Sequence, residues 1–413
     1  MTVGDPIALT AADSLAEALS DPGAVRAAAP AGGRAWPQSL AGGAAGIALL
    51  HIERARSGRG DWATARAWLS WAASDDLTAA ANAGLYMGAP ALAFATHAAA
   101  GSTGRYQRTL AALDDATIAV TRRRLAAAHA GIDRGDRPEM KEFDAIRGLT
   151  GLGALHLQRH PDHPVTGEVL SYLVRLTEPP LPARDDGLPG WWTNVSPNGE
   201  PSPHYPDGHG NFGLSHGIGA ALALLSLALL GHRPVPGAHE AIARICAWSD
   251  QWRQDTPDGA WWPGLITADQ VRADGVEASL RPRPSWCYGI AGTARAQQLA
   301  GMALGDTARQ QSAEDAMLAA LRDPAQVELL DGIGLCHGSA GLLQAAWRMA
   351  ADAESSPITD ELPSLAARLV RQISDPVADP ELLDGAAGAA LAMHTTGTGT
   401  APASGWDAFL LLA

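Results

Sequence analysis

The sequence predicts an all-α protein, a double-layered α-barrel in which seven repeats each supply one inner and one outer helix. Three observations predict it: a glycine motif recurs seven times, an apolar run of helical length follows each copy, and strand patterns are weak throughout. A closed ring of repeats can hold 413 residues in one core, so we expect a single domain over residues 1–413.

The repeat motif is a glycine, two small or apolar residues and, in five of the seven copies, a second glycine. The second and fourth copies lack that second glycine at its usual place. A glycine at a helix entrance lets the backbone turn sharply and pack closely, so we expect each first glycine to begin an inner helix. The first glycines are Gly43, Gly88, Gly148, Gly217, Gly289, Gly338 and Gly385.

Segments between the motifs supply the outer layer. Amphipathic stretches predict outer helices over residues 61–73, 109–130, 237–252, 313–321 and 361–373. Two segments are irregular, and each carries a Trp pair: residues 177–211, with eight prolines, and residues 256–284. Long loops of this kind are usually functional. We expect the Trp pairs to anchor these loops, and contact with a peptide substrate is the alternative.

Bulk properties limit the partners and the compartment. The 30 basic and 44 acidic residues give a net charge of −14, which argues against nucleic acid and anionic membranes as general partners. The apolar stretch 217–231 is 15 residues long, short of the roughly 18 that a spanning helix needs, so we expect a core helix and no integral membrane protein. No Lys or Arg precedes Arg26, unlike a signal peptide, and the three cysteines show no pairing logic. These features predict a reducing cytoplasm.

Two cysteines occupy matching positions in the repeat. Cys287 in "RPSWCYG" and Cys336 in "LCHGSAG" are 49 residues apart, one repeat length, and His337 follows the second. If the inner helices begin at one end of a ring, these side chains converge there. Two thiolates and one imidazole suit a single zinc ion with an open fourth position, as in catalytic sites. A non-catalytic site completed by another residue, such as His216, is the alternative. Cys246 is predicted to be a core residue.

The segments "SWCYG" and "CHGSAG", with a preceding "GLSHG" and seven Gly-rich repeats, resemble the lanthionine synthetase C family. The members of this family are the cyclases of class I lanthipeptide biosynthesis, and the resemblance covers essentially the whole chain. It implies an α/α toroid with one zinc ion held by Cys287, Cys336 and His337. It also implies the addition of peptide Cys thiols to dehydroalanine or dehydrobutyrine, which forms (methyl)lanthionine thioether rings.

The resemblance also carries over four catalytic positions. The family's motif histidine falls on His216 in "GLSHG", where Ser215 replaces Ala. The arginine four residues before the first zinc cysteine falls on Arg283, and the tyrosine after that cysteine falls on Tyr288. The third-repeat aspartate falls on Asp144. These matches imply proton transfer by His216, stabilisation of enolate charge by Arg283 and a hydrogen bond from Tyr288.

The role of Asp144 is open between two readings. The carboxylate would orient or charge-balance His216 or Arg283, or it would cap a helix N-terminus. The direction of the Arg283 side chain is also open, because Pro282 and Pro284 flank it.

The resemblance implies several partners. The substrate is a dehydrated lanthipeptide precursor, and a dehydratase and an exporter are expected, with transient complexes at the inner face of the membrane. A zinc-containing protein that binds thiols or peptides without turnover is the main alternative. A zinc hydrolase or an α/α-barrel glycosidase is less favoured, since no paired acidic residues stand out in the repeat loops.

Overall fold

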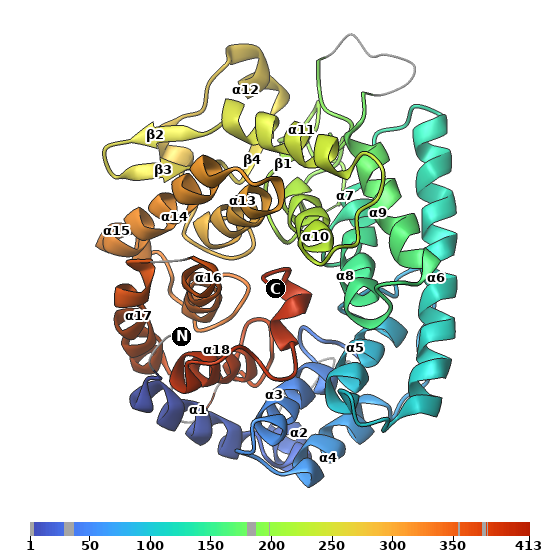
Figure 1. Cartoon of the computed structure of the whole chain (residues 1–413), viewed down its shortest axis with the longest axis vertical. Helices are drawn as coiled ribbons and strands as arrows, with labels where there is room; N and C mark the ends of the chain where they lie inside the picture. Colours follow the sequence, from blue (N-terminus) through green and yellow to red (C-terminus); the bar gives the residue numbers. More distant parts are fainter. Residues whose placement is uncertain are drawn as a thin grey trace. The chain divides into compact units, whose positions relative to one another are not determined.

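The computed structural model describes residues 4–28, 37–179, 187–197, 199–353, 356–373, 377 and 379–413 (Figure 1). Parts of the Pro-rich segment 177–211, namely residues 180–186 and 198, lie outside these ranges. The chain forms two compact units, Met1–Thr117 with Glu328–Ala408, and Ile118–Val327 with Phe409–Ala413. The expected single domain over residues 1–413 stays a prediction.

The first unit contains four inner helices that pack in the order α16, α18, α3, α5. They are α3 (Ala44–Arg56), α5 (Ala89–Ala100), α16 (Ser339–Asp352) and α18 (Ala386–Thr398). Outer helices of this unit cover them, with α4 on α3, α17 on α16 and α1 on α18. The remaining helices of the unit are α1 (Pro6–Ala18), α2 (Pro22–Ala28), α4 (Trp62–Ala72), α6 (Gln107–Asp133) and α17 (Ile358–Gln372). Helix α6 is long and continues into the second unit.

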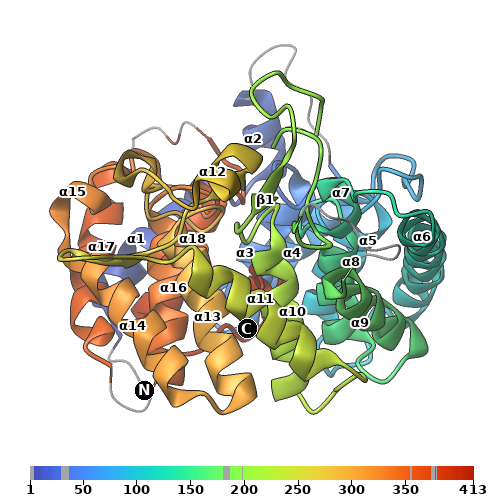
Figure 2. The ribbon, with the colours of Figure 1, turned by 90° about the horizontal axis from the view of Figure 1, so that it is seen from above.

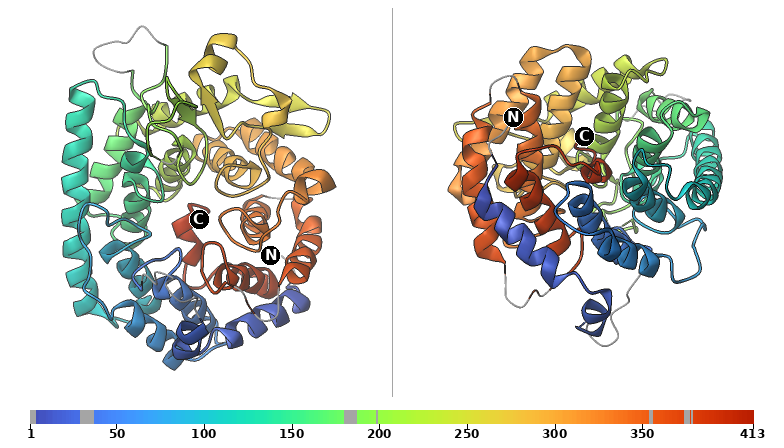
Figure 3. Two further views of the ribbon diagram at one scale, coloured as in Figure 1. Left: turned by 180° about the vertical axis from the view of Figure 1, so that it is seen from behind. Right: turned by 60° about the horizontal axis from the view of Figure 1, so that its bottom comes forward.

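Helix α1 is the outer partner of the seventh inner helix. The blue α1 lies against the red α18 in Figures 1 and 3, and the Asp5 amide donates to the Thr396 carbonyl at 3.3 Å. The contact is close, since a Cβ at Gly397 would lie 2.8 Å from the Leu9 Cα. One helical pair is therefore built from opposite ends of the sequence, and the periodicity analysis did not assign it.

The second unit contains three inner helices that pack in the order α8, α10, α13. Their outer partners lie alongside them, with α9 on α8, α11 on α9 and α10, and α14 on α13 (Figure 2). These six helices are α8 (Leu149–Arg159), α9 (Pro164–Thr177), α10 (Ile218–Leu230), α11 (Ala238–Gln251), α13 (Ile290–Leu304) and α14 (Thr307–Arg322). The sequence pattern had marked α11 and α14 but not α9.

The irregular segments of the second unit form short elements. Strand β1 (His209–Asn211) pairs antiparallel with β4 (Leu265–Thr267), and β2 (Gln254–Thr256) pairs with β3 (Gly259–Trp261). The short helices of the chain are α7 (Met140–Phe143), α12 (Ala268–Ala273), α15 (Pro324–Val327), η1 (Ala278–Leu280) and η2 (Trp406–Leu410). The anchoring role predicted for the Trp pairs is confirmed by burial of all four rings, Trp191, Trp192, Trp261 and Trp262.

Every first glycine of the repeat occupies the N-cap of an inner helix, as predicted. The second glycine has a packing reason. A Cβ at Gly46, Gly292 or Gly388 would lie 2.0–2.1 Å from the carbonyl oxygen of the residue six positions earlier. In the fourth repeat Gly219 makes the equivalent approach, 2.4 Å from the Phe212 carbonyl oxygen, so its shifted glycine keeps the same function.

The apolar stretch 217–231 contains α10, which is 13 residues long and buried along most of its length. Burying each Leu or Ile side chain stabilises the fold by about 1.5–3 kcal/mol, which is the expected role of a core helix. Among the described residues, no helix has both the length and the apolar character needed to cross a bilayer.

Candidate active site and metal centre

Asp144 joins the entrances of two inner helices. It follows α7 and lies four residues before Gly148, the N-cap of α8. Its Oδ1 accepts hydrogen bonds from the Arg147 and Gly148 amides, both at 2.6 Å, and its Oδ2 accepts from His216 Nδ1 at 2.6 Å. One oxygen therefore anchors His216, and the other fixes the turn that leads into α8. Asp144 is not the N-cap of that helix, because Gly148 occupies the N-cap and has no side-chain cap bond.

His216 lies immediately before Gly217, the N-cap of α10. Asp144 is 1% exposed, whereas the His216 side chain is 26% exposed. A backbone hydrogen bond from Ala145 to the Ser215 carbonyl, at 3.1 Å, ties the two loops together. Because Nδ1 donates to the carboxylate, Nε2 is the ring atom left for proton exchange. No described residue hydrogen bonds to Nε2.

Arg124 is a nearby cation that the sequence analysis missed. It lies in α6, and its Nη2 donates to the Lys141 carbonyl at 2.7 Å. Burial lowers the pKa of its guanidinium, and the negative charges of Asp144 and Glu142 partly offset that effect. Arg124 therefore contributes positive charge near Asp144. No sequence signal marked it, because it stands inside an ordinary amphipathic helix next to two other arginines.

The Cys287 loop is fixed on several sides. Cys287 is 6% exposed, and its carbonyl accepts from both the amide and the hydroxyl of Ser215 at 3.3 Å. The neighbouring Trp286 is fully buried and donates from Nε1 to the Leu410 carbonyl at 2.9 Å. Ser215, where the family motif has Ala, thus adds a hydroxyl contact to this loop.

The Cys336–His337 loop precedes Gly338, the N-cap of α16. The Leu335 and Cys336 amides both donate to the Leu383 carbonyl, at 2.7 and 2.9 Å. The Leu383 carbonyl therefore holds the backbone of this loop in place, and the side chains of Cys336 and His337 are half-buried.

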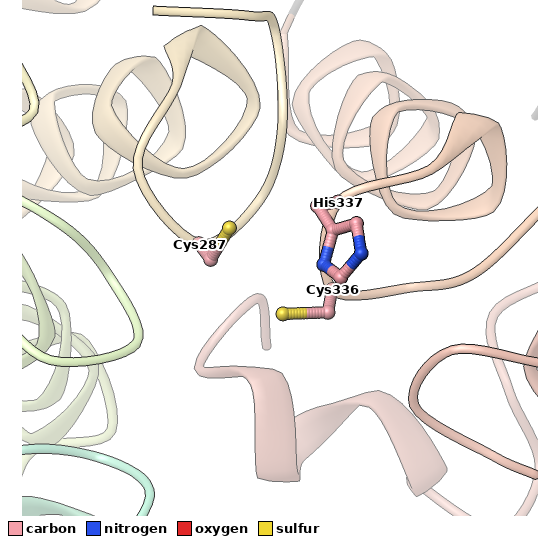
Figure 4. Close-up of side chains that lie close together, drawn as sticks. All are labelled: Cys287, Cys336 and His337. Atoms are coloured by element: carbon pink, nitrogen blue, oxygen red, sulfur yellow. The ribbon is translucent and has the colours of Figure 1, made fainter. Parts of the chain in front are cut away.

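The three predicted metal ligands are close together (Figure 4). The thiols of Cys287 and Cys336 and a ring nitrogen of His337 all lie within 4.8 Å of one another. Tetrahedral zinc bonds sulfur at about 2.3 Å, which places two sulfur ligands about 3.8 Å apart. The two soft sulfur donors and one nitrogen donor fit such an ion with small side-chain adjustments, so this cluster could hold a metal ion. Cys246 is buried elsewhere, and burial raises the pKa of its thiol to about 11, as expected of a core residue.

Tyr288 and Arg283 have different environments. The Tyr288 ring is half-buried, with its centroid 6.3 Å from that of His216 and the planes tilted by 33°. Arg283 is exposed and makes no hydrogen bond or ion pair through its side chain with any described residue. Its backbone is fixed, since a Cβ at Gly289 would lie 1.9 Å from the Arg283 carbonyl oxygen. The structure thus brings His216 to Asp144 and Tyr288, and it gives the Arg283 side chain no partner within the described part of the chain.

These observations define a helical-repeat protein with a Cys₂His cluster that could hold a metal ion and with a buried carboxylate on a partly exposed histidine. A family model described as "Lanthionine synthetase C-like protein" matches residues 34–411, and the chain belongs to this family. The resemblance inferred from the motifs is thereby confirmed.

Two comparisons with individual proteins agree with the family. The chain is 24% identical over 212 residues to the nisin biosynthesis protein NisC of Lactococcus lactis subsp. lactis, a match that covers 49% of this chain and 48% of that protein. The match thus spans about half of the relative's length. The solved structure of nisin cyclase superposes with a TM-score of 0.77 at 19% identity, over 92% of this chain and 93% of that chain. This likeness confirms the predicted fold class, an all-α α/α toroid.

Proposed function

We propose that the protein is a zinc-dependent lanthipeptide cyclase, which adds Cys thiols of a dehydrated precursor peptide to dehydroalanine or dehydrobutyrine in the same peptide. The observation that carries the proposal is the Cys287, Cys336 and His337 cluster, whose donor atoms lie within 4.8 Å of one another in a chain of this family. The names of the two relatives, a nisin biosynthesis protein and a nisin cyclase, support the substrate class.

A free thiol is a weak nucleophile at neutral pH, since its pKa is about 8.5. Zinc held by Cys287, Cys336 and His337 would keep a bound peptide thiol in its thiolate form. The reaction also needs a proton for the α-carbon of the dehydro residue. Two cysteine thiolates and a neutral histidine that bind zinc cannot supply this proton, so another residue has to donate it. His216 is the group that we assign to this task.

The proposed reaction is a net addition of the peptide S–H across the carbon–carbon double bond of the dehydro residue. The peptide sulfur forms a C–S bond to the β-carbon, and the π electrons of the dehydro residue move onto its amide carbonyl as an enolate. His216 then donates the proton on Nε2 to the α-carbon, and the proton released by the thiol restores the imidazolium. Asp144 supports this cycle because its Oδ2 holds Nδ1 at 2.6 Å and stabilises the positive ring.

Arg283 and Tyr288 complete the proposed site. The Arg283 guanidinium is exposed and carries no competing ion pair among the described residues, so it is available to the oxygen on which enolate charge develops. The Tyr288 ring flanks His216 and would donate a hydrogen bond near the closing ring. A dehydratase and an exporter, cytoplasmic location and transient contact with the inner membrane face belong to the same proposal.

The test uses two substrates, a dehydrated nisin precursor and a synthetic peptide with one dehydroalanine and one cysteine. The zinc-loaded protein is incubated with each, and remaining thiols are alkylated and counted by mass spectrometry. We expect thiols to disappear faster than in a control without protein, at unchanged peptide mass. Undiminished thiols with both peptides would reject cyclase activity. Peptide binding without thiol loss would favour the alternative, a zinc-containing thiol- or peptide-binding protein.

A further inference from the structure

Two buried side chains of the second unit donate hydrogen bonds to the same short segment, residues 409–412. Trp286 donates from Nε1 to the Leu410 carbonyl at 2.9 Å. Arg295, in α13, donates from Nε and Nη2 to the Leu412 carbonyl at 3.0 and 2.7 Å. The exposed fractions of Trp286 and Arg295 are 0% and 1%, so these bonds form in the interior of the unit.

Each of these bonds satisfies a group that is costly to bury alone. The Arg295 guanidinium is charged at every ordinary pH, and a buried charge needs hydrogen-bond acceptors. The Leu410 carbonyl lies at the end of η2, and the last carbonyls of a helix have no partner within it. Removing either donor therefore leaves a buried polar group without its partner.

The segment is bent at Leu411, between the two accepting carbonyls. The φ angle of Leu411 is +58°, in the left-handed region that bulky residues rarely adopt. Such a conformation persists only where the surrounding structure holds it. The Leu411 side chain is 1% exposed, and the bonds from Trp286 and Arg295 reach the residues directly before and after it. Packing and these two donors thus keep the segment in a strained shape.

The segment also fixes the loop that carries Cys287. Trp286 directly precedes Cys287, and the bond to Leu410 anchors its ring. The Trp286 carbonyl packs against α13, since a Cβ at Gly292 would lie 2.1 Å from that carbonyl oxygen. Both the ring and the backbone of Trp286 are therefore held, and the position of the Cys287 thiol follows from them.

We propose that segment 409–412 positions Cys287 for metal binding and that Arg295 is a positioning residue acting through this segment. The inference rests on the zinc site of the proposed function. Arg295 holds Leu412, the segment holds the Trp286 ring, and the ring holds the loop of Cys287. Contacts that orient metal ligands in this way are worth about 10- to 100-fold in metal affinity.

Alkylation of the zinc-free protein tests the proposal without relying on metal or on activity. The protein is treated with iodoacetamide, and labelling of each cysteine is followed by peptide mass spectrometry. We expect Trp286→Phe, which keeps an aromatic ring but loses the N–H, and Arg295→Met to label Cys287 about 10- to 100-fold faster than wild type. Cys246 is 2% exposed in α11 and should keep its wild-type rate. Unchanged labelling of Cys287 would overturn the proposal, and so would equal acceleration at Cys246, since the whole fold would then have loosened.

Trp252→Phe is the matched control for the loss of a buried indole. Trp252 is 2% exposed, and its Nε1 has no hydrogen-bond partner among the described residues. The substitution removes the same volume as Trp286→Phe but no bond, so labelling of Cys287 should stay within about threefold of wild type. Equal acceleration in the two variants would assign the effect to lost volume and reject the role of the Leu410 bond.

Zinc affinity, measured by competition with a chromophoric chelator, is the second readout. Arg295→Met and Trp286→Phe should raise the zinc dissociation constant by about 10- to 100-fold. Arg295→Lys should recover part of the loss, because its ammonium can still donate to the Leu412 carbonyl. If Arg295→Met does not fold, Trp286→Phe and Arg295→Lys decide the question.

The outcomes for the two proposals can be told apart. Folded Arg295→Met and Trp286→Phe proteins that bind zinc within about threefold of wild type would overturn the positioning role. If wild type binds zinc but closes no rings, the proposed function fails, and the dissociation constants still decide the role of the segment. If wild type binds no zinc, both proposals fail.

Discussion

The protein contains two His–Asp pairs at the entrances of inner helices, and the two pairs differ in burial and in contact distance. In the pair of the second unit, Asp144 is buried, and the His216 contact is 2.6 Å long. In the pair of the first unit, His337 and Asp384 are both half-exposed and lie 3.4 Å apart. The first pair is complete in the protein alone, because backbone amides satisfy the other Asp144 oxygen. The second contact is longer than a normal hydrogen bond, and both of its side chains remain open to solvent.

The difference matches the two roles that we propose for the histidines, proton transfer for His216 and metal binding for His337. A proton-transfer group has to be aligned before the substrate arrives, so a buried, fully hydrogen-bonded carboxylate suits it. A metal ligand adjusts its position as the ion binds, and an exposed contact of this kind stabilises a protein little by itself, by about 0–1 kcal/mol.

Replacing Cys336 with Ala should have the largest effect. The cluster loses one of two sulfur donors, so we expect a zinc stoichiometry well below one and no detectable ring closure. Metal content by inductively coupled plasma mass spectrometry and thiol counting check the two outcomes. Cys246→Ala is the matched control, since that thiol is buried away from the cluster and should leave zinc content unchanged. Wild-type zinc content in Cys336→Ala would remove Cys336 from the proposed ligand set.

His216→Ala should separate proton transfer from metal binding. Because His216 is not one of the three clustered ligands, the variant should keep its zinc and lose ring-closing rate by about 100- to 10,000-fold. Zinc content and the rate of thiol loss are measured on the same preparation. A full rate would reject the proton-transfer role, and loss of zinc would indicate that His216 completes the metal site.

Asp144→Asn should disrupt the hydrogen bonds that hold His216. Asn has one acceptor oxygen in place of two, so either the His216 Nδ1–H or the Arg147 and Gly148 amides lose their acceptor, and we expect a rate loss of roughly 100-fold. Asp144→Ala should also lose the two hydrogen bonds that Oδ1 accepts in the turn before α8, which costs about 1–3 kcal/mol of unfolding free energy. Urea unfolding measures this loss of stability, and thiol counting measures the loss of rate. Equal stability of Asp144→Ala and wild type would contradict the role of Asp144 in fixing this turn.

Mild acid should weaken the fold through buried histidines outside both pairs. Burial lowers the pKa of His51, His209 and His394 to about 4 from an ordinary value of 6.5. Between these values the unfolded chain binds protons that the folded chain does not, so stability falls as the pH drops from about 6.5 to 4. Each histidine contributes on the order of 2–3 kcal/mol to this loss. Urea unfolding of the zinc-free protein at several pH values measures it, and stability that is constant across this range would contradict the neutral, buried state of these rings.

Ser215→Ala should have the smallest effect, since it restores the residue of the family motif. The variant loses one hydroxyl contact of 3.3 Å to the Cys287 carbonyl, while the backbone amide keeps its own bond to the same oxygen. We expect a loss of at most about 1 kcal/mol in unfolding free energy and a near-normal ring-closing rate. Thermal unfolding measures the first quantity. A rate loss above about tenfold would give the Ser215 hydroxyl a role in holding the Cys287 loop.

Much of the fold and of the candidate site could be predicted from local sequence features. A glycine that begins a helix and the apolar run after it can both be recognised from a stretch of about a dozen residues. The sequence therefore predicts all seven inner helices correctly. Cys287, Cys336 and His337 were found for the same reason, because the repeat length places each of them at a known position before a helix. His216 and Asp144 could be matched to positions in the family's motifs because each motif is only a few residues long.

Other features depended on which segments meet in space. Helix α1 packs on α18 from the opposite end of the chain, and no periodicity links residues 6–18 to residues 386–398. Arg124 comes close to Asp144 because its side chain reaches from α6 to the Lys141 carbonyl. Asp384 faces His337 because the Leu383 carbonyl accepts the amides of Leu335 and Cys336. Local backbone and side-chain preferences are enough to specify the inner helices and the residue types at their entrances. Which carboxylate faces which imidazole follows only from the folded chain, because hydrogen bonds and ion pairs depend on distances of a few ångströms between segments far apart in the sequence.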